Sequence, residues 1–304
     1  MNPKNLILFD DTNVSRCWAR IFLESLARPK GEIVPVLLTI RGLGEEVPIE
    51  ISGIRQLLDK DLAAKGKFLS STVASTIFPI SMWNPKLNRQ ELFDRYLGTL
   101  KQLKKCKQNH KGIYFERLLK HGPTECNQLD FFLRSRLENG NHRRSVLQAA
   151  IVDPIKDLTN QPVRGFPCLQ QVSFVPFGDG ELAVNGFYGS QYVYEKAYGN
   201  YIGLINLGRF IAHEMKLRLT QLNCFTGIAT LGVPKKAWKT SQEKSGRSLV
   251  KWVRNKVYLH SNRLLAEMDN HLRQLFGLCP FSANQLDDTL CRNCIDSTCS
   301  GYSN

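Results

Sequence analysis

Apolar side chains recur every three or four residues in five segments of the chain. Side chains at that spacing share one face of a helix, so the pattern predicts helices with a buried side. These helices cover residues 11–28, 54–64, 88–104, 127–138 and 200–221. In the fourth, the predicted buried positions are Leu129, Phe132, Leu133 and Leu137. The fifth is the longest and most apolar, and we expect it to lie in the core.

Shorter apolar runs bounded by Gly, Pro and Asn predict β-strands. They cover residues 33–40, 47–51, 146–152, 168–177, 181–188 and 223–231. Gly178-Asp179-Gly180 separates two of them and predicts a hairpin, because Asp and Gly tolerate the backbone of a tight turn. Strands and helices in this order, with no internal repeat or clear linker, predict one α+β domain over residues 1–276 and a tail over 277–304.

Composition excludes several classes of protein. The 304 residues are 42% apolar and 22% charged, which is typical of a globular chain and not of a disordered or collagen-like one. No apolar run reaches the roughly 18 residues of a membrane span, and the first residues lack the apolar core of a secretory signal. The nine scattered cysteines fit reduced thiols better than a disulfide framework. We therefore expect a cytoplasmic protein with no membrane partner.

The balance of charge favours an anionic partner. The chain carries 41 Lys and Arg against 27 Asp and Glu, a formal net charge of +14. Much of the positive charge falls in two blocks, residues 101–111 and 235–256. A nucleotide and a nucleic acid both match such charge, although no aromatic–basic motif of an RNA-binding module accompanies it. For the first block, a solvated helix end is the alternative.

The middle of the chain holds residue types that carry chemistry. Arg143-Arg144 precedes a predicted strand, and Pro167-Cys168 opens the next one. Ser190 and Asn200 then stand ten residues apart, before the long apolar helix. From residues 114 to 232, this order resembles the thymidylate synthase superfamily, which includes pyrimidine nucleotide hydroxymethylases.

The resemblance implies both a fold and a reaction. The fold would be a mixed sheet with a long buried helix, paired sheet to sheet in a homodimer. The family transfers a one-carbon unit from 5,10-methylenetetrahydrofolate to C5 of a pyrimidine nucleotide. The Cys of the Pro-Cys pair attacks C6 as a thiolate, which makes C5 nucleophilic. Cys168 matches that residue, and the alternative is a small core thiol, since free Cys is among the most buried residue types.

The resemblance also implies contacts with the nucleotide. Arg143 and Arg144 match an Arg pair that binds the phosphate of the nucleotide in the neighbouring subunit. The planar guanidinium fork suits this role. A solvated pair is the alternative. Ser190 matches a nucleotide-binding Ser. Asn200 matches the Asn that reads the O4 and N3 edge of uracil, and it would also serve as a helix N-cap.

Other positions match less closely or depart from the family. Glu91 is the candidate for the family's catalytic Glu, and Arg41 for its N-terminal phosphate-binding Arg. Gly189 replaces a phosphate-binding Arg, Leu169 replaces a His, and Tyr192 replaces an Asp associated with folate. These departures leave a second function open, in which a protein of this fold binds nucleic acid or an unusual nucleotide without the family's reaction.

Four of the nine cysteines lie in the tail. Their positions are Cys279, Cys291, Cys294 and Cys299. The two-residue gap of Cys291-Arg-Asn-Cys294 allows both sulfurs to face one tetrahedral metal, so the tail predicts a structural zinc site. An iron–sulfur cluster and unbound thiols are the alternatives.

Overall fold

The computed structural model describes residues 6–28, 30–45, 49–51, 53–110, 112–140, 142–158, 160 and 166–232, with 249, 250 and 253. These residues belong to one compact unit. Most of the basic block 235–256 and all of the tail 277–304 lie outside them. The extent of the domain and the role of the tail therefore stay predictions.

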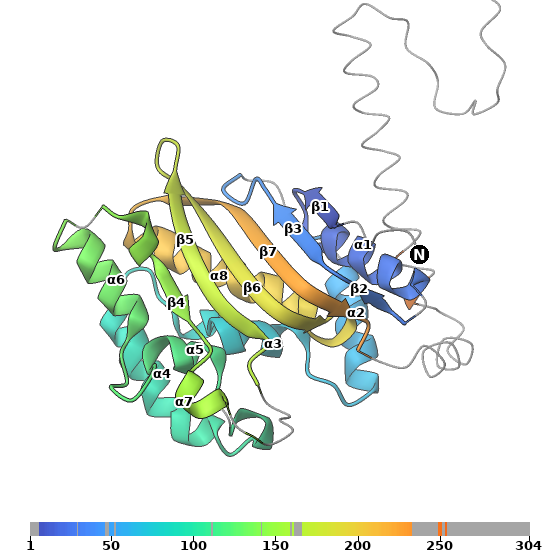
Figure 1. The fold of residues 1–304 in the computed structure, drawn as a ribbon, viewed down its shortest axis with the longest axis horizontal. Coiled ribbons are helices and arrows are strands. Elements are labelled where there is room, and N and C mark those ends of the chain that lie inside the picture. The colour runs from blue at the N-terminus through green and yellow to red at the C-terminus, as the bar shows by residue number, and fades with distance from the viewer. Residues whose placement is uncertain are drawn as a thin grey trace, which may run out of the picture. The chain divides into compact units, whose positions relative to one another are not determined.

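A mixed sheet of seven strands forms the centre of the described chain (Figure 1). The strands are β1 (Ile7–Asp11), β2 (Glu32–Ile33), β3 (Val36–Ile40), β4 (Gln148–Ala150), β5 (Leu169–Phe177), β6 (Glu181–Tyr192) and β7 (Arg218–Thr230). Their order is β1-β3-β7-β6-β5-β4, and β2 pairs with the end of β7. β1 runs parallel to β3 and β6 parallel to β7, while the other pairs are antiparallel. The predicted mixed sheet and the predicted hairpin are both confirmed.

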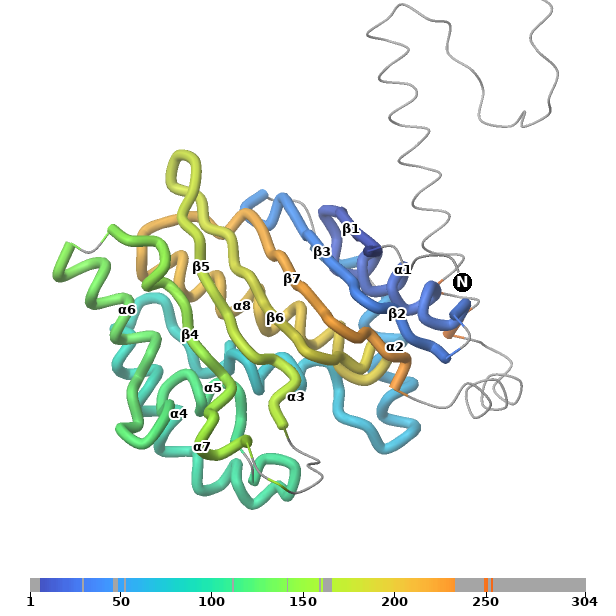
Figure 2. Tube along the Cα trace, viewed as in Figure 1, coloured from blue at the N-terminus to red at the C-terminus, as the bar shows by residue number. Residues whose placement is uncertain are grey.

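Eight α-helices accompany the sheet in the described residues. They are α1 (Val14–Ala27), α2 (Ile54–Ala64), α3 (Ser70–Ile77), α4 (Arg89–Leu103), α5 (Tyr114–Leu119), α6 (Gln128–Leu137), α7 (Pro154–Asp157) and α8 (Tyr198–Glu214). In Figures 1 and 2 the sheet turns one face to the viewer, and α8 runs behind β6 and β7. Most residues of α8 are buried. The predicted α+β class with a long buried helix is thus confirmed.

Two glycines let α8 lie unusually close to α3. A Cβ added to Gly199 would lie 2.5 Å from the carbonyl oxygen of Ser70, and one added to Gly203 would lie 2.8 Å from that of Ala74. Both distances are shorter than real Cβ contacts allow, and the blocking atoms belong to the backbone. Glycine at these two positions therefore sets the distance between the two helices.

Some predicted boundaries are wrong. The fifth helix ends at Glu214 rather than at residue 221, because Lys216 takes a left-handed backbone with φ of +53°. From Arg218 the side chains alternate between buried and partly exposed, as a strand requires, and β7 begins there. The predicted strand 33–40 is divided into β2 and β3 around Pro35, which has no N–H to donate.

Two further predictions fail locally, and one strand was not predicted. Leu137 is 45% exposed, because it is the last residue of α6 and lies beyond the packed part of the helix. The described end of the predicted strand 47–51 is a bend rather than a strand. β1 precedes α1, and the sequence predicted no strand there.

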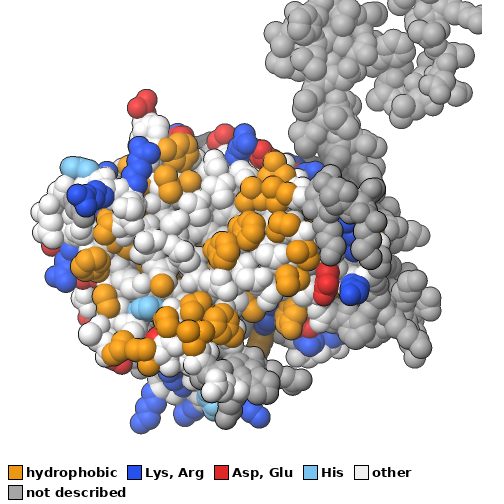
Figure 3. Space-filling view, in the orientation of Figure 1, with side chains coloured by type: hydrophobic (Ala, Val, Ile, Leu, Met, Phe, Trp, Pro, Cys, Tyr) orange, Lys and Arg blue, Asp and Glu red, His pale blue; other side chains and the backbone are white. Residues whose placement is uncertain are grey.

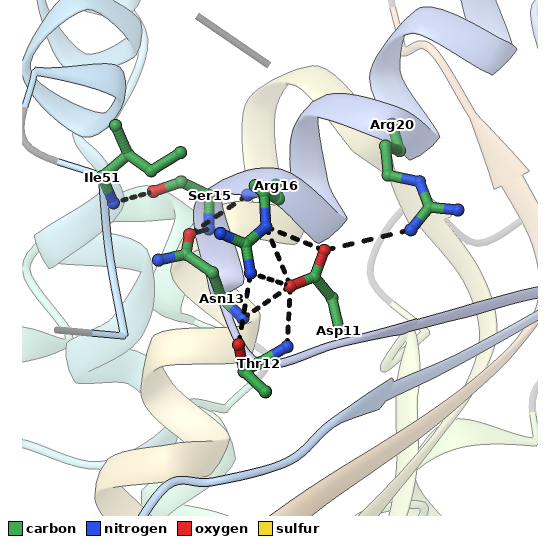
Figure 4. A network of polar contacts seen from close by, with 7 residues as sticks. All are labelled: Asp11, Thr12, Asn13, Ser15, Arg16, Arg20 and Ile51. Carbon is green, nitrogen blue, oxygen red and sulfur yellow. Dashed lines mark hydrogen bonds and ion pairs between the residues drawn. The ribbon is translucent and has the colours of Figure 1, made fainter. Parts of the chain in front are cut away.

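A polar network fixes the start of α1 (Figure 4). The Asp11 carboxylate accepts hydrogen bonds from the backbone N–H groups of Thr12 and Asn13 and pairs with Arg16. The Asn13 side chain caps the helix by accepting from the N–H groups of Ser15 and Arg16. Ser15 Oγ accepts from the N–H of Ile51 at 2.9 Å and lies 2.9 Å from the Tyr198 hydroxyl. The network thus joins α1 to the segment before α2 and to α8.

Candidate active site

The structure brings Cys168 and Ser190 together. Cys168 directly precedes β5, and Ser190 lies near the end of β6, which pairs with β5 through Leu169 and Tyr188. The Cys168 Sγ and Ser190 Oγ atoms are 3.7 Å apart, within hydrogen-bonding distance for sulfur. Both residues are only partly buried. A thiol and a hydroxyl, 22 positions apart in the sequence, therefore form one accessible pair.

Two other cysteines show what a core thiol looks like in this fold. Cys17 and Cys224 are fully buried, and burial raises the pKa of the Cys224 thiol to about 12. It also raises the pKa of Cys17 well above its usual range, with Asp11 adding to the effect. Because Cys168 is accessible, it differs from both, and the core-thiol alternative does not describe it.

Tyr114 holds the chain at the start of β5. Its hydroxyl accepts a hydrogen bond from the Leu169 N–H at 3.5 Å. Burial raises its pKa to about 12, and the neighbouring Cys168 adds to the shift, so the phenol is neutral at pH 7. One turn later in α5, Arg117 forms a buried bidentate ion pair with Asp157, with N–O distances of 2.6 and 2.9 Å. Both contacts come from α5, and no local sequence pattern indicates either of them.

A lysine contributes positive charge near the thiol. Lys196 lies in a π-helical turn, Val193–Ala197, that joins β6 to α8. Burial lowers the pKa of Lys196, and the neighbouring charge of Lys67 lowers it further. Glu195 and Cys168 act in the opposite direction and raise this pKa in part. The Lys196 Nζ atom lies 5.1 Å from the centre of the Phe68 ring. The Lys196 ammonium and a Cys168 thiolate would therefore attract each other.

Two buried polar atoms beside Ser190 have no hydrogen-bond partner among the described residues. They are the Tyr188 hydroxyl and the Gln191 Nε2 atom. The other amide atom of Gln191, Oε1, accepts from the Tyr201 hydroxyl at 3.1 Å, which ties β6 to the first turns of α8. Buried polar atoms are nearly always paired, so unpaired ones call for an explanation, and a bound polar molecule or an ordered water would supply one.

Asn200 lies in the first turn of α8 and is 4% exposed. The helix starts two residues earlier, at Tyr198, and continues directly from the π-helical turn. The prediction that Asn200 caps this helix is therefore wrong. Its predicted role in reading a uracil edge is still a prediction, and the contact between its neighbour Tyr201 and Gln191 places this turn against the Ser190 end of β6.

The predicted phosphate-binding arginines lie at the other end of the sheet. Arg143 and Arg144 are exposed and stand just before β4, which runs antiparallel to β5. Arg144 lines a hollow of about 320 Å³ with Phe177 and Gly178, at the far end of β5 from Cys168. The eight steps along β5 from Leu169 to Phe177 span about 26 Å. Within one chain, the arginine pair is therefore remote from the thiol.

Arg41 lies toward that same far end. It follows β3, whose last residue, Ile40, pairs with Leu222 of β7. Leu222 pairs with Val184 of β6, six residues before Ser190 and so about 20 Å from it. The guanidinium of Arg41 pairs with Asp10 at 2.5 Å.

Glu91 occupies an exposed position at the start of α4. Its backbone N–H donates to the Asn88 side chain at 3.1 Å, and its carboxylate accepts from the Asn88 Nδ2 atom at 3.4 Å. These contacts make Glu91 part of a helix cap, and no contact in the described residues joins it to Cys168 or Ser190. Its catalytic role stays a prediction. A carboxylate that interacts with Lys196 is that of Glu195, which pairs with Lys67 at 2.9 Å.

Gly189 stands where the resemblance would place a phosphate-binding Arg. Its N–H donates to the carbonyl oxygen of Cys168 at 3.0 Å. A Cβ at this position would lie 2.7 Å from the Nε2 atom of Gln170. The Gln170 side chain thus lies where a side chain at position 189 would begin.

Comparison with models of known protein families finds no match to this chain, and comparison with curated protein sequences finds none either. The resemblance to the thymidylate synthase superfamily therefore stays a prediction from the sequence.

The predicted metal ligands Cys279, Cys291, Cys294 and Cys299 lie outside the described residues, so the zinc site stays a prediction. Where the chain is described, no group of three or more His, Cys, Asp or Glu side chains is arranged to hold a metal. No helix within the described ranges is long and apolar enough to cross a bilayer.

Proposed function

We propose that the chain is a divergent member of the thymidylate synthase superfamily that transfers a one-carbon unit to C5 of a uracil-type nucleotide. The observation that carries this proposal is the 3.7 Å approach of Cys168 Sγ to Ser190 Oγ. The reaction needs an accessible thiol beside a nucleotide-binding hydroxyl, and the mixed sheet holds the two in register. The family supplies the reaction by resemblance, and the geometry supports it.

In this proposal each group near the thiol has a distinct task. The Cys168 thiolate forms a bond to C6 of the pyrimidine, and the electron pair displaced from the ring double bond makes C5 nucleophilic. The Lys196 ammonium attracts the negative charge that the thiolate carries. The Tyr114 hydroxyl holds the backbone at Leu169, and so fixes the position of the attacking sulfur. Asn200 reads the uracil edge from the first turn of α8.

The donor of the one-carbon unit would be 5,10-methylenetetrahydrofolate, an anionic molecule with a pterin ring system. Exposed aromatic rings and positive charge support its binding. The rings of Phe68 and Tyr192 are both substantially exposed and can stack on a flat heterocycle. Lys67 and Lys196 supply positive charge in the same region as Phe68. When bound, the folate would supply the carbon unit.

A homodimer joined through the open face of the sheet completes the proposal. Thr39, Asn223, Asn185 and Ser173 lie opposite one another on β3, β7, β6 and β5, and hydrogen bonds of 2.8 to 3.1 Å join their side chains. Beside them, the rings of Phe187 and Phe225 stack at 5.0 Å. Figure 3 shows hydrophobic and uncharged side chains in the middle of this face and charged ones mainly toward its rim. Such a face suits a second copy of itself.

A covalent adduct tests the reaction. Incubation with 5-fluoro-dUMP and methylenetetrahydrofolate should add the mass of both molecules to the protein, because fluorine at C5 prevents the final proton loss. Cys168→Ser should abolish the adduct, and Cys126→Ser, at an exposed cysteine outside the site, should keep it. If no pyrimidine nucleotide gives an adduct on the wild-type protein, the proposed reaction is wrong.

The second function, binding of nucleic acid, is supported by Gly189 and by exposed positive charge. Lys101, Lys105 and Lys107 are exposed around the end of α4. In this case the affinity for RNA or DNA should fall steeply between low and moderate salt, since binding releases counterions. An affinity that is independent of salt would argue against this function.

A further inference from the structure

A second hollow lies among α2, α3 and α8, and neither Cys168 nor Ser190 lines it. It encloses about 290 Å³, at the small end of the range for ligand-binding pockets. Segment 49–50 and Arg55 line it, together with side chains from one face of α3 and one face of α8. Nothing in the proposed reaction uses this pocket.

Hydrogen bonds hold one wall of the pocket in place. The Tyr198 hydroxyl donates to the Glu50 Oε1 atom at 2.6 Å, and Arg55 pairs with Oε2 at 3.1 Å. The network in Figure 4 continues this wall, because Ser15 Oγ lies 2.9 Å from the Tyr198 hydroxyl. The charges of Glu50 and Arg55 therefore compensate each other.

The opposite wall, on α8, has polar groups without partners. Arg209 forms no ion pair within the described residues. It reaches the surface, yet the atoms packed around it lower its pKa, and Glu50 partly offsets this shift. Asn206 is 8% exposed, and its amide has no hydrogen-bond partner among the described residues. Among the described residues, the pocket thus offers one cation without an ion pair and one free amide.

The rest of the lining consists of five apolar side chains and three serines, Ser70, Ser71 and Ser75. Its apolar side chains are Ile49, Ala74, Ile80, Ile202 and Ile205. An unpaired guanidinium and an amide above an aliphatic wall match a molecule that has a carboxylate at one end and an apolar body. We propose that this pocket binds a small organic monoanion, with the carboxylate on Arg209 and Asn206 and the apolar part against the isoleucines.

Methyl NMR of the full chain tests this proposal, with benzoate as the probe. Four isoleucines line the pocket and serve as reporters, and Ile7, Ile151 and Ile228, on other elements, serve as references. Benzoate should shift the pocket methyl signals in a saturable way and leave the references unchanged. Arg209→Gln should weaken this binding by about ten-fold, because a hydrogen bond to a charged group is lost. Arg134→Gln, on the exposed side of α6, should not change it.

Two further ligands test whether the pocket recognises the charge of benzoate, its ring or both. Acetate keeps the charge without the ring, and benzylamine keeps the ring with the opposite charge, so both should bind much more weakly than benzoate. Benzylamine binding as tightly as benzoate, or an unchanged affinity in Arg209→Gln, would overturn the proposal. A benzoate titration that does not shift the methyl signals of the four pocket isoleucines would also overturn the proposal. The test does not involve Cys168, so its outcome is independent of the proposed reaction.

Discussion

The thiol of Cys168 has different neighbours from every other described cysteine. Cys17 and Cys224 are enclosed by the core, and Cys106 and Cys126 lie in loops near the surface. Cys168 lies 3.7 Å from the Ser190 hydroxyl, and a charge on it would interact with that of Lys196. Chemical reactivity at single residues should follow from this difference.

Lys196→Gln should slow alkylation of Cys168 by iodoacetamide by about three- to ten-fold at pH 7, because the variant loses an ammonium that would attract the charge of the thiolate. Because burial lowers the pKa of Lys196, the ammonium deprotonates at a lower pH than an exposed lysine does. The difference between the two proteins should therefore shrink as the pH rises. Peptide mass spectrometry gives the rate at each cysteine.

Cys126 in the same protein provides an internal reference for this measurement, since it is exposed and remote in sequence from Lys196. Lys101→Gln, an exposed lysine on α4, is the matched substitution. Equal rates at Cys168 in wild type and Lys196→Gln would show that the ammonium does not act on the thiol.

Sequence patterns found part of this site. The spacing of Cys168, Ser190 and Asn200 resembles a known family, and the structure places the first two in contact. Lys196 and Tyr114 were missed, because their roles arise from a π-helical turn and from α5, which no local pattern connects to Cys168. Glu91 was selected on local sequence alone, and it caps its own helix.

At the scale of elements, the contact between α3 and α8 depends on two glycines. Gly199→Ala or Gly203→Ala should lower the free energy of unfolding by about 2 kcal/mol or more, because the added methyl meets backbone that cannot move independently. Chemical denaturation followed by circular dichroism measures this change.

Gly98→Ala is the matched control for these variants. Gly98 lies inside α4, and a Cβ there would meet nothing within 4 Å. The substitution should stabilise the protein by about 0.5–1 kcal/mol, since alanine is the better helix former. If Gly199→Ala has the same effect as Gly98→Ala, the close approach of α3 and α8 does not limit packing.

Element boundaries show what a periodic pattern can and cannot predict. The helices 54–64 and 88–104 and the strand 168–177 agree with α2, α4 and β5 to within one residue, since their ends carry clear turn signals. The start of β7 was assigned to a helix, because its leucines are also spaced as helix positions are. Only the left-handed backbone at Lys216 separates the two elements.

At the scale of the whole molecule, the 26 Å length of β5 separates the Arg pair from the thiol. If Arg143 and Arg144 bind the nucleotide in the neighbouring subunit, two variants that are inactive alone should form active mixed dimers. Cys168→Ser and the double variant Arg143→Gln/Arg144→Gln should each give no 5-fluoro-dUMP adduct alone. Refolded together in equal amounts, they should recover about a quarter of the wild-type adduct, because half of the dimers contain one intact site.

The adduct in the mixture must lie on the chain that carries Cys168, which mass spectrometry identifies. No recovery, in a mixture shown to contain mixed dimers, would mean that the arginines do not act across subunits. Gel filtration of wild type at several concentrations provides the control for dimer formation.

The burial of α8 also determines which unfolding events can expose its backbone to solvent. The helix is covered by the sheet on one side and by α3 on another, and Gly199 and Gly203 bring its first turns directly against the α3 backbone. Local fluctuations can release a surface helix such as α4, but they cannot expose the backbone of α8 without separating the sheet from its helical layer. The amide hydrogens of α8 should therefore exchange with solvent only when the whole compact unit unfolds.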